Sequence, residues 1–323
     1  MIKKVIKIAK LIGNTPVLKL DDEFIDLYAK LEFKNFSGSI KDRAVNNIIH
    51  NAIFEQKIDM NTTIVESSSG NFAISLALHC KFLNLKFIAV VDPNINEISL
   101  KTLQLLATEV IMIKDIDETG GYLLNRIAKV KEVLKQTQNS FWTNQYENEN
   151  NYKSYRLLAN EIIRDFEELD YLFVPVSSCG TIVGLSTYLK SNFKDLKIIG
   201  VDVEGSMIFS DKKKRRNLSG LGSSKKSHFR INELIDDFII LNQNEISDGC
   251  TELLNQHALF GGASSGACYK GAQKYLKNND TGSIFPKAMI LIPDSGVSYI
   301  DNIYNKEWVE KFCKIDEMNF ENN

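Results

Sequence analysis

Short apolar runs rich in β-branched residues alternate along the chain with stretches whose apolar residues recur at helical spacing. The rhythm continues through both halves of the sequence, and we find no internal repeat. Such alternation is typical of parallel sheets with helices on both faces, so it predicts an α/β fold. The predicted strands lie in 62–71, 86–93, 109–115, 170–181, 197–205 and 287–300, and the predicted helices in 72–83, 98–108, 120–136, 182–193 and 262–278.

Small and hydroxyl residues gather in three loops that precede predicted helices. They are ESSSGN at 66–71, SSCGT at 177–181 and GGASSGA at 261–267. Backbone N–H groups at a helix start can bind anions, and α/β folds bind ligands beyond the carboxyl ends of strands. The first loop is equally consistent with a serine cap and a turn. The second suits a phosphate, although it has neither P-loop spacing nor a G-x-G-x-x-G fingerprint.

The third loop contains G-x-S-x-G centred on Ser264, a pattern also found in α/β-hydrolases. A hydrolase triad of that class runs Ser, then Asp or Glu, then His along the chain. All four histidines precede Ser264, so this order cannot be met. A hydrolase is kept only as a remote alternative.

A lysine stands where a further helix is expected to begin. In FKNFSGSIKDRAVNNIIHNAI (33–53), Lys41 follows Ser39 by two residues. Helix starts favour serine caps and acidic residues, and a lysine there meets the positive end of the helix dipole. Taken alone, Lys41 is most simply a solvated lysine. Together with the three loops, however, it suits pyridoxal phosphate, which has an aldehyde, a phosphate and a ring nitrogen.

Composition limits the alternatives. A length of 323 residues suggests about two domains, and a formal net charge of -2 gives no basic field for nucleic acid. The basic run at 211–217 is interpreted as a solvated loop, with a mouth that attracts anionic substrates as the minor alternative. No apolar run approaches the ~18 residues of a membrane span, and lysines interrupt the first 13 residues too often for a signal peptide.

Cysteine and histidine usage further limits the compartment of the protein and the kinds of site it can have. The odd number of cysteines and the absence of C-x-x-C argue against a disulfide framework and for a reducing cytosol. The histidines form no H-x-x-x-H or Cys/His cluster, so no zinc site is expected. We therefore expect a soluble cytoplasmic protein with no metal, no nucleic-acid partner and no membrane partner. Its partners should be small molecules.

Several segments resemble one enzyme family. KLEFKNFSGSIKDRA (30–44) resembles the lysine segment of the cysteine synthase and cystathionine β-synthase family, the fold-type II pyridoxal-phosphate enzymes. ESSSGN resembles that family's T-S-G-N substrate loop, SSCGT its G-T-G-G-T phosphate loop, and GASSGA its G-x-S-x-G loop for the ring nitrogen. LIGNTPVLKL (11–20) resembles its G-x-T-P entry strand. The match covers nearly the whole chain.

The resemblance implies a fold, a cofactor and a set of site residues. The fold would be two doubly wound α/β domains with mostly parallel sheets, tryptophan synthase β-like, with pyridoxal 5'-phosphate between them. Lys41 would carry the cofactor and act as general base, Asn71 would meet the ring hydroxyl, and Ser264 the ring nitrogen. The substrate carboxylate would be held by Ser68, Ser69 and Gly70, and the cofactor phosphate by Ser177, Ser178, Cys179, Gly180 and Thr181.

The expected division places a smaller domain at 38–141, inserted into a larger one formed by 1–37 and 142–323. The smaller domain should close on the substrate carboxylate. The family also implies a homodimer. Without a segment that resembles a haem-binding extension or a regulatory C-terminal domain, we do not expect a full-length cystathionine β-synthase.

Three further segments, 119–134, 141–151 and 201–211, resemble the branch that makes N-(2-amino-2-carboxyethyl)-L-glutamate. That reaction joins O-phospho-L-serine to L-glutamate on the way to 2,3-diaminopropionate, a siderophore building block. Within these segments Arg126 is a candidate for pairing with a carboxylate or phosphate, and Tyr146 for substrate binding. An exposed helix arginine and a core aromatic are the competing interpretations. A cysteine synthase using O-acetylserine or O-phosphoserine remains the main alternative, and an inactive binding protein a remote one.

The chain departs from the family pattern at three places. Phe36 and Ser37 replace a common Pro and Gly in the lysine loop, and Cys179 stands in the phosphate loop. The exit loop PDSGVSYI (293–300) lacks the arginine often found there. These departures bear on the choice of substrate more than on cofactor binding.

Overall fold

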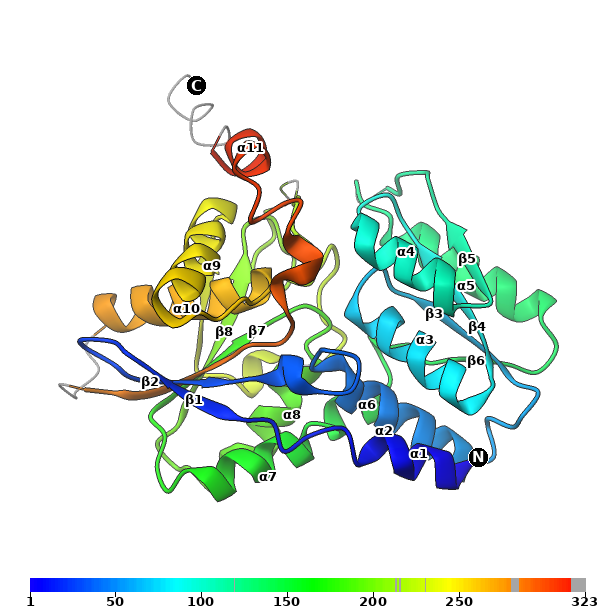
Figure 1. Ribbon diagram of the computed structural model, residues 1–323, viewed down its shortest axis with the longest axis horizontal. Helices are drawn as coiled ribbons and strands as arrows, with labels where there is room; N and C mark the ends of the chain where they lie inside the picture. Colours follow the sequence, from blue (N-terminus) through cyan, green and yellow to red (C-terminus); the bar gives the residue numbers. More distant parts are fainter. Residues whose placement is uncertain (119, 213, 215, 230, 280–284, 315–323) are drawn as a thin grey trace.

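The computed structural model describes residues 1–118, 120–212, 214, 216–229, 231–279 and 285–314. The chain forms two β-sheets of unequal size, and each sheet is covered by helices. The two sheets with their helices lie side by side (Figure 1). The predicted α/β class is confirmed. In the larger sheet the strand order is β1 (Val17–Leu20), β2 (Asp26–Lys30), β10 (Lys287–Leu291), β7 (Tyr171–Pro175), β8 (Lys197–Val203) and β9 (Asp237–Leu241).

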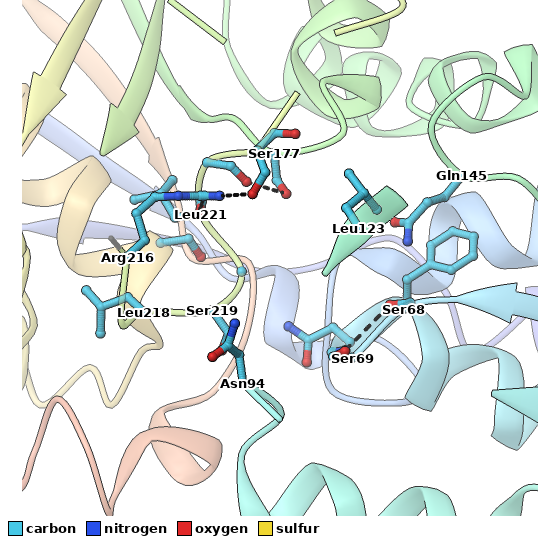
Figure 2. Close-up of a pocket in the computed structure, with 18 of the residues that line it drawn as sticks. Ser68, Ser69, Asn94, Leu123, Gln145, Ser177, Arg216, Leu218, Ser219 and Leu221 are labelled. Carbon is cyan, nitrogen blue, oxygen red and sulfur yellow. Dashed lines mark hydrogen bonds between the residues drawn. The ribbon is translucent and has the colours of Figure 1, made fainter. Parts of the chain in front are cut away.

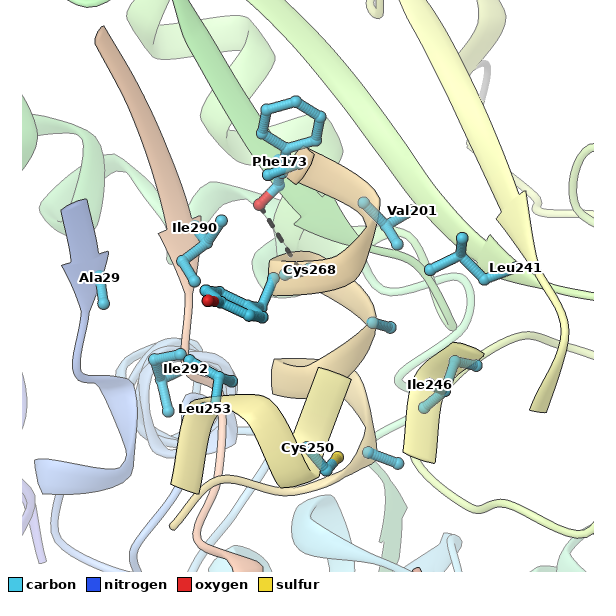
Figure 3. Close-up of a cluster of buried hydrophobic side chains, with 14 of the residues drawn as sticks. Ala29, Phe173, Val201, Leu241, Ile246, Cys250, Leu253, Cys268, Ile290 and Ile292 are labelled. Atoms are coloured by element: carbon cyan, nitrogen blue, oxygen red, sulfur yellow. Dashed lines mark hydrogen bonds between the residues drawn. The ribbon is translucent and has the colours of Figure 1, made fainter. Parts of the chain in front are cut away.

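Helices cover both faces of this larger sheet. Its neighbouring strands are parallel except β1, which runs antiparallel to β2. One face packs on α9 (Gln243–His257) and α10 (Ala263–Asn278), as Figure 3 shows, and the other on α7 (Arg156–Asp165) and α8 (Gly180–Leu189). Burial on both faces explains why the central strands are continuous apolar runs rather than alternating patterns.

The smaller sheet is entirely parallel. Its order is β5 (Glu109–Met112), β4 (Lys86–Val91), β3 (Thr63–Ser67) and β6 (Ser140–Trp142). Helices α2 (Lys41–Phe54), α3 (Asn71–Leu83) and α4 (Glu97–Leu106) pack on one face. Helix α5 (Leu123–Gln136) packs on the other face through Val130 and Val133. The sheet is therefore a second doubly covered layer with its own core.

Most elements predicted from periodicity are present, with ends shifted by a few residues. Periodicity did not predict the edge strands β1, β6 and β9, strand β2, or the helices α7 and α9, although β1 lies in the 11–20 segment that the family resemblance identified as an entry strand. Strand β6 has only three residues, and β1 and β9 are partly exposed, so none of these three strands gives a long apolar run. The remaining short elements are α1 (Ile2–Ala9), α6 (Glu149–Lys153), α11 (Lys306–Val309), η1 (Glu32–Lys34), η2 (Ile231–Glu233), η3 (Gly296–Tyr299) and η4 (Glu310–Lys314).

The smaller sheet lies within 38–141 except for Trp142, the last residue of β6. The N-terminal helix α1, which the predicted division assigned to the larger domain, places Val5 in the core formed by α2 and α3. We keep the division at 38 and 141 as a proposal, with α1 in contact with the smaller unit.

A buried ionic cluster fixes the start of α2 to the larger sheet. Arg43 pairs through Nε with Glu32 (2.7 Å) and through Nη1 with Glu161 on α7 (2.8 Å). Glu161 also pairs with Lys30 of β2 (2.9 Å). All four side chains are buried, so each charge depends on its partners. The cluster holds Lys41, two residues before Arg43, at a fixed place between the sheets.

Candidate active site

A cavity lies between the two sheets, and Figure 2 shows part of its lining. Its walls include residues within two positions of the ends of β3, β4, β7 and β10, so it lies at the carboxyl ends of strands, as expected for α/β folds. Most of the predicted site residues line it, namely Lys41, Ser68, Ser69, Gly70, Asn71, Arg126, Tyr146, Ser177, Thr181 and Ser264. Ser178, Cys179 and Gly180 lie in the same loop but do not line the cavity.

Lys41 is the first residue of α2, as predicted. Its N–H donates to Ser39 Oγ (3.3 Å), although the residue before the helix is Ile40 and no side chain caps the end. The Lys41 side chain borders the cavity and is otherwise enclosed by protein. Burial lowers the pKa of its ammonium group, and the carboxylate of Asp294 opposes part of that shift. The neutral amine, which can attack an aldehyde or take a proton, is therefore favoured.

Asp294 follows β10 and was not among the predicted site residues. It is buried, and its Oδ2 accepts hydrogen bonds from Asn71 Nδ2 (2.6 Å) and Tyr299 Oη (2.9 Å). Burial raises the pKa of Asp294, whereas Asn71, Tyr299 and Lys41 oppose the rise. Its sequence signal is the acidic residue in the exit loop PDSGVSYI (293–300), but a single carboxylate after a strand does not by itself indicate a site.

Ser264 lies at the start of α10, buried and facing the cavity. The preceding Gly262 approaches Asp294 so closely that a Cβ at this position would meet Asp294 Oδ1 at 2.2 Å. Only glycine fits there, and this close approach brings Ser264 and Asp294 to the same wall of the cavity. A hydroxyl and a carboxylate therefore border the same part of the site.

The 177–181 loop leads directly into α8. Ser177 Oγ donates to the carbonyl of Gly222 (3.1 Å), which ties this loop to a second lining segment at 216–224. Cys179 adopts a left-handed φ of 67°, and burial raises the pKa of its thiol to about 12. The thiol is therefore not a reactive thiolate at neutral pH. A Cβ on Gly180 would meet Asn151 Oδ1 at 2.3 Å, so this helix start is closely packed.

Arg126 is buried rather than exposed on its helix. Its Nη1 donates to Ser69 Oγ (2.9 Å), and its Nε lies 3.2 Å from Asp92 Oδ2. Ser69 Oγ in turn donates to Asp92 Oδ2 (3.3 Å). The three side chains form a closed group beside the 68–71 loop. The charge of Arg126 is thus already compensated by one carboxylate.

Two further lining residues come from the loop after β6. Gln145 was not predicted; its Nε2 donates to the carbonyl of Ser67 (3.3 Å), which fixes it beside the substrate loop. Tyr146 borders the cavity, and Lys225 Nζ lies 5.2 Å from the centre of its ring. Burial raises the pKa of the Tyr146 hydroxyl, while the charges of Arg126 and Arg216 lower it. The hydroxyl is therefore within electrostatic range of both guanidinium groups.

Arg216 corrects the interpretation of the basic run 211–217. That run was interpreted as a solvated loop, yet Arg216 is partly buried and lines the cavity (Figure 2). Its Nη1 donates to the carbonyl of Leu221 (3.1 Å) and its Nη2 to Ser224 Oγ (2.9 Å). Lys213 and Arg215 of the run lie outside the described residues. The minor alternative, a site that attracts anions, fits Arg216 better.

A family model described as pyridoxal-phosphate dependent enzyme matches residues 8–292. The chain belongs to the pyridoxal-phosphate-dependent enzymes. Among solved structures, this enzyme is 29% identical to a hydrogen sulfide-producing enzyme from Fusobacterium nucleatum, with a TM-score of 0.83 and coverage of 90% of this chain and 98% of the other. It is also 29% identical to the O-acetylserine dependent cystathionine beta-synthase from Helicobacter pylori (TM-score 0.84; 92% and 98% covered). A cysteine synthase from Entamoeba histolytica has the same fold at 24% identity (TM-score 0.82; 92% and 90% covered).

The residues of the cavity fit the cofactor of this enzyme family. An enclosed lysine with a lowered pKa suits the aldehyde, and hydroxyls at the start of α8 suit the phosphate. The Ser264 hydroxyl suits the ring nitrogen, and the Asn71 amide suits the ring oxygen. Across the described ranges, no group of three or more His, Cys, Asp or Glu side chains could hold a metal ion. No helix in those ranges is long and apolar enough to cross a membrane.

Proposed function

We propose that this enzyme catalyses a β-replacement that joins O-phospho-L-serine to L-glutamate, giving N-(2-amino-2-carboxyethyl)-L-glutamate and phosphate. One observation carries the proposal: Arg126 and Arg216 line the same cavity from different lobes. Here the smaller lobe is the part of the chain around the smaller sheet, which carries Arg126, and the larger lobe is the part around the larger sheet, which carries Arg216. Phosphoserine brings a carboxylate and a phosphate, and glutamate brings two carboxylates, whereas sulfide has neither. Guanidinium groups in an enclosed site favour carboxylate and phosphate ligands.

The role of each residue in this proposed reaction follows from where its side chain lies. Bound pyridoxal phosphate supplies an electron sink for the bonds at the substrate Cα. Lys41 holds the cofactor, takes the Cα proton of the donor and later returns it. The Cβ–O bond breaks and phosphate leaves with the electron pair. The amine of glutamate then forms the Cβ–N bond and loses one proton.

Binding roles are divided among the loops. The 68–71 loop holds the donor carboxylate through hydroxyls and backbone N–H groups, with Ser69 oriented by Arg126. The 177–181 loop holds the cofactor phosphate at the start of α8. Asn71 and Ser264 meet the ring, and a neutral hydroxyl at the ring nitrogen leaves the nitrogen unprotonated, which favours elimination over transamination. Ser178, Cys179 and Gly180 contribute backbone N–H groups.

Product identification tests this proposal. The purified enzyme is mixed with O-phospho-L-serine and then, separately, with L-glutamate, sulfide or L-homocysteine, and each product is identified by mass. We expect the glutamate adduct, with release of one phosphate per product. Rapid formation of cysteine with no glutamate adduct would overturn the choice of acceptor and leave a cysteine synthase.

A sulfur acceptor is the second candidate. It is supported by the likeness to two proteins that are 29% identical to this chain, one a hydrogen sulfide-producing enzyme and one an O-acetylserine dependent cystathionine beta-synthase. The same mass assay with O-acetylserine as donor distinguishes it. An inactive binding protein is the remote candidate, and failure to take up pyridoxal phosphate would favour it.

The proposal includes a place in metabolism and an assembly state. The product would serve 2,3-diaminopropionate synthesis in the cytoplasm, for siderophores or related compounds, as the resembling branch does. The enzyme would act as a homodimer. A mass of 36.6 kDa by light scattering, equal to one chain, would contradict the dimer.

A further inference from the structure

Two arginines line the cavity, but only Arg126 forms an ion pair with a carboxylate among the described residues. Arg126 lies 3.2 Å from the carboxylate of Asp92. Arg216 forms no ion pair with a carboxylate of the described residues, and its two hydrogen bonds go to a carbonyl and a hydroxyl. A guanidinium has five N–H donors, so three of them form no hydrogen bond within the described part of the chain. A partly buried guanidinium of this kind suits an anionic ligand.

The segment that carries Arg216 is held in place on both sides. Residues 216–224 line the cavity, and Ser177 fixes the carbonyl of Gly222. Next to this segment, Lys225 lies over the ring of Tyr146 and 3.7 Å from Glu147. Arg216 and Tyr146 are thereby held at one cavity from different lobes. Burial lowers the pKa of Arg216, and the charges of Asp202 and Tyr146 oppose that shift, which agrees with their proximity.

The donor already has its own binding groups elsewhere. The 68–71 loop and Arg126 are joined through Ser69, so they form one group on the smaller lobe. Arg216 belongs to the other lobe, in the segment that follows β8. An amino-acid acceptor with a second carboxylate needs a cation that the donor site does not use. Arg216 is the lining arginine that meets this requirement.

We propose that Arg216, assisted by the Tyr146 hydroxyl, binds the side-chain carboxylate of the acceptor amino acid. This assignment rests on the proposed function, and it makes Arg216 the residue that selects a dicarboxylic acceptor over sulfide. Arg126 acts on the donor side by orienting Ser69. The two arginines therefore divide the two substrates between them.

The test separates the two steps of the reaction in wild type, R216Q and R126Q. The matched control is R156Q, because Arg156 is exposed at the start of α7. Phosphate release on mixing with O-phospho-L-serine alone reports the donor step. Product formation with L-glutamate or sulfide reports the acceptor step.

We expect R216Q to leave the donor step and the sulfide reaction unchanged, and to raise the KM for glutamate by about 30-fold or more. R126Q should instead impair the donor step, and R156Q should match wild type. An unchanged glutamate KM in R216Q, or an equal loss with sulfide, would overturn the assignment. If R216Q does not retain cofactor, R216K replaces it with the same criteria, because it keeps the charge but loses the planar fork.

Calorimetry with glutarate distinguishes failure of this assignment from failure of the proposed function. Glutarate is a dicarboxylate without an amine, so its binding to the holoenzyme does not require turnover. Glutarate binding that is present in wild type and lost in R216Q supports the carboxylate site, even if glutamate is not a substrate. No glutarate binding to wild type, or equal binding to R216Q, would overturn the site whatever acceptor the enzyme uses.

Discussion

Asn71 Nδ2 donates a 2.6 Å hydrogen bond to Asp294 Oδ2, which joins the first residue of α3 to the loop after β10 across the cavity. The same carboxylate influences Lys41, because its charge opposes the lowering of the lysine pKa by burial. One buried carboxylate therefore both links the two lobes and raises the pKa of Lys41 against the effect of burial.

Asp294→Asn should lower the pKa of Lys41 further. With the carboxylate gone, burial acts on the lysine unopposed, so its neutral amine persists to lower pH. We expect the pH profile for capture of pyridoxal phosphate by cofactor-free enzyme to move toward acid, measured by absorbance of the bound cofactor. Tyr299→Phe is the control, because it removes a hydrogen bond to the carboxylate and keeps the charge. A shift toward alkaline pH in Asp294→Asn would contradict this account.

Lys41→Ala should abolish covalent attachment of the cofactor and lower kcat by roughly a thousandfold or more, because both the amine and the general base are lost. Borohydride reduction followed by peptide mass analysis should find the cofactor on Lys41 in wild type only. The folding cores lie away from this side chain, so the unfolding midpoint of the cofactor-free variant should stay close to that of wild type. Attachment at another lysine would show that the site is misassigned.

Arg126→Gln should damage both the donor step and local stability. It leaves the buried Asp92 carboxylate without its cation and releases Ser69. We expect the donor KM to rise by about 10- to 100-fold and the urea midpoint to fall. The double variant D92N/R126Q should recover part of the midpoint but not the donor KM, because the bond to Ser69 is still missing. Recovery of both would indicate that Arg126 acts only on stability.

Glu161→Gln should destabilise the enzyme by about 3 kcal/mol near neutral pH, because Arg43 and Lys30 lose a shared buried partner. Burial acts to raise the pKa of Glu161, but the interactions with Arg43 and Lys30 win and lower it from 4.5 to about 2. A carboxylate with a lowered folded-state pKa stabilises the fold above pH 4.5, and that contribution is lost as the pH falls toward 2.

The pH dependence of unfolding checks this sign. Between pH 5 and 2, the wild-type urea midpoint should fall more steeply than that of Glu161→Gln, which has no carboxylate to protonate there. Glu167→Gln, an exposed site just beyond α7, is the matched control and should follow wild type. Parallel slopes for all three proteins would remove Glu161 from the acid response.

Sequence by itself determined the α/β class, the alternation of elements and the loops whose residues line the cavity. Apolar periodicity and loop composition are local properties, written within about twenty residues, so they survive without knowledge of the partners. Lys41 at the start of α2, and Ser68 to Asn71 after β3, lie where those local signals placed them. Short edge strands such as β6 escaped, because three residues carry too little pattern.

Tertiary structure alone decided which charges meet. Asn71 and Asp294 are 223 positions apart in the chain, and Arg126 and Ser69 are 57 apart. Whether an arginine pairs with a carboxylate, as Arg126 does with Asp92, or bonds to a backbone carbonyl, as Arg216 does with Leu221, depends on which surfaces pack together. The interaction energy between two charges falls with their distance in space and grows with burial, whatever their separation along the sequence. For that reason the composition of the basic run 211–217 indicated solvent, while the fold brought its last arginine into the cavity.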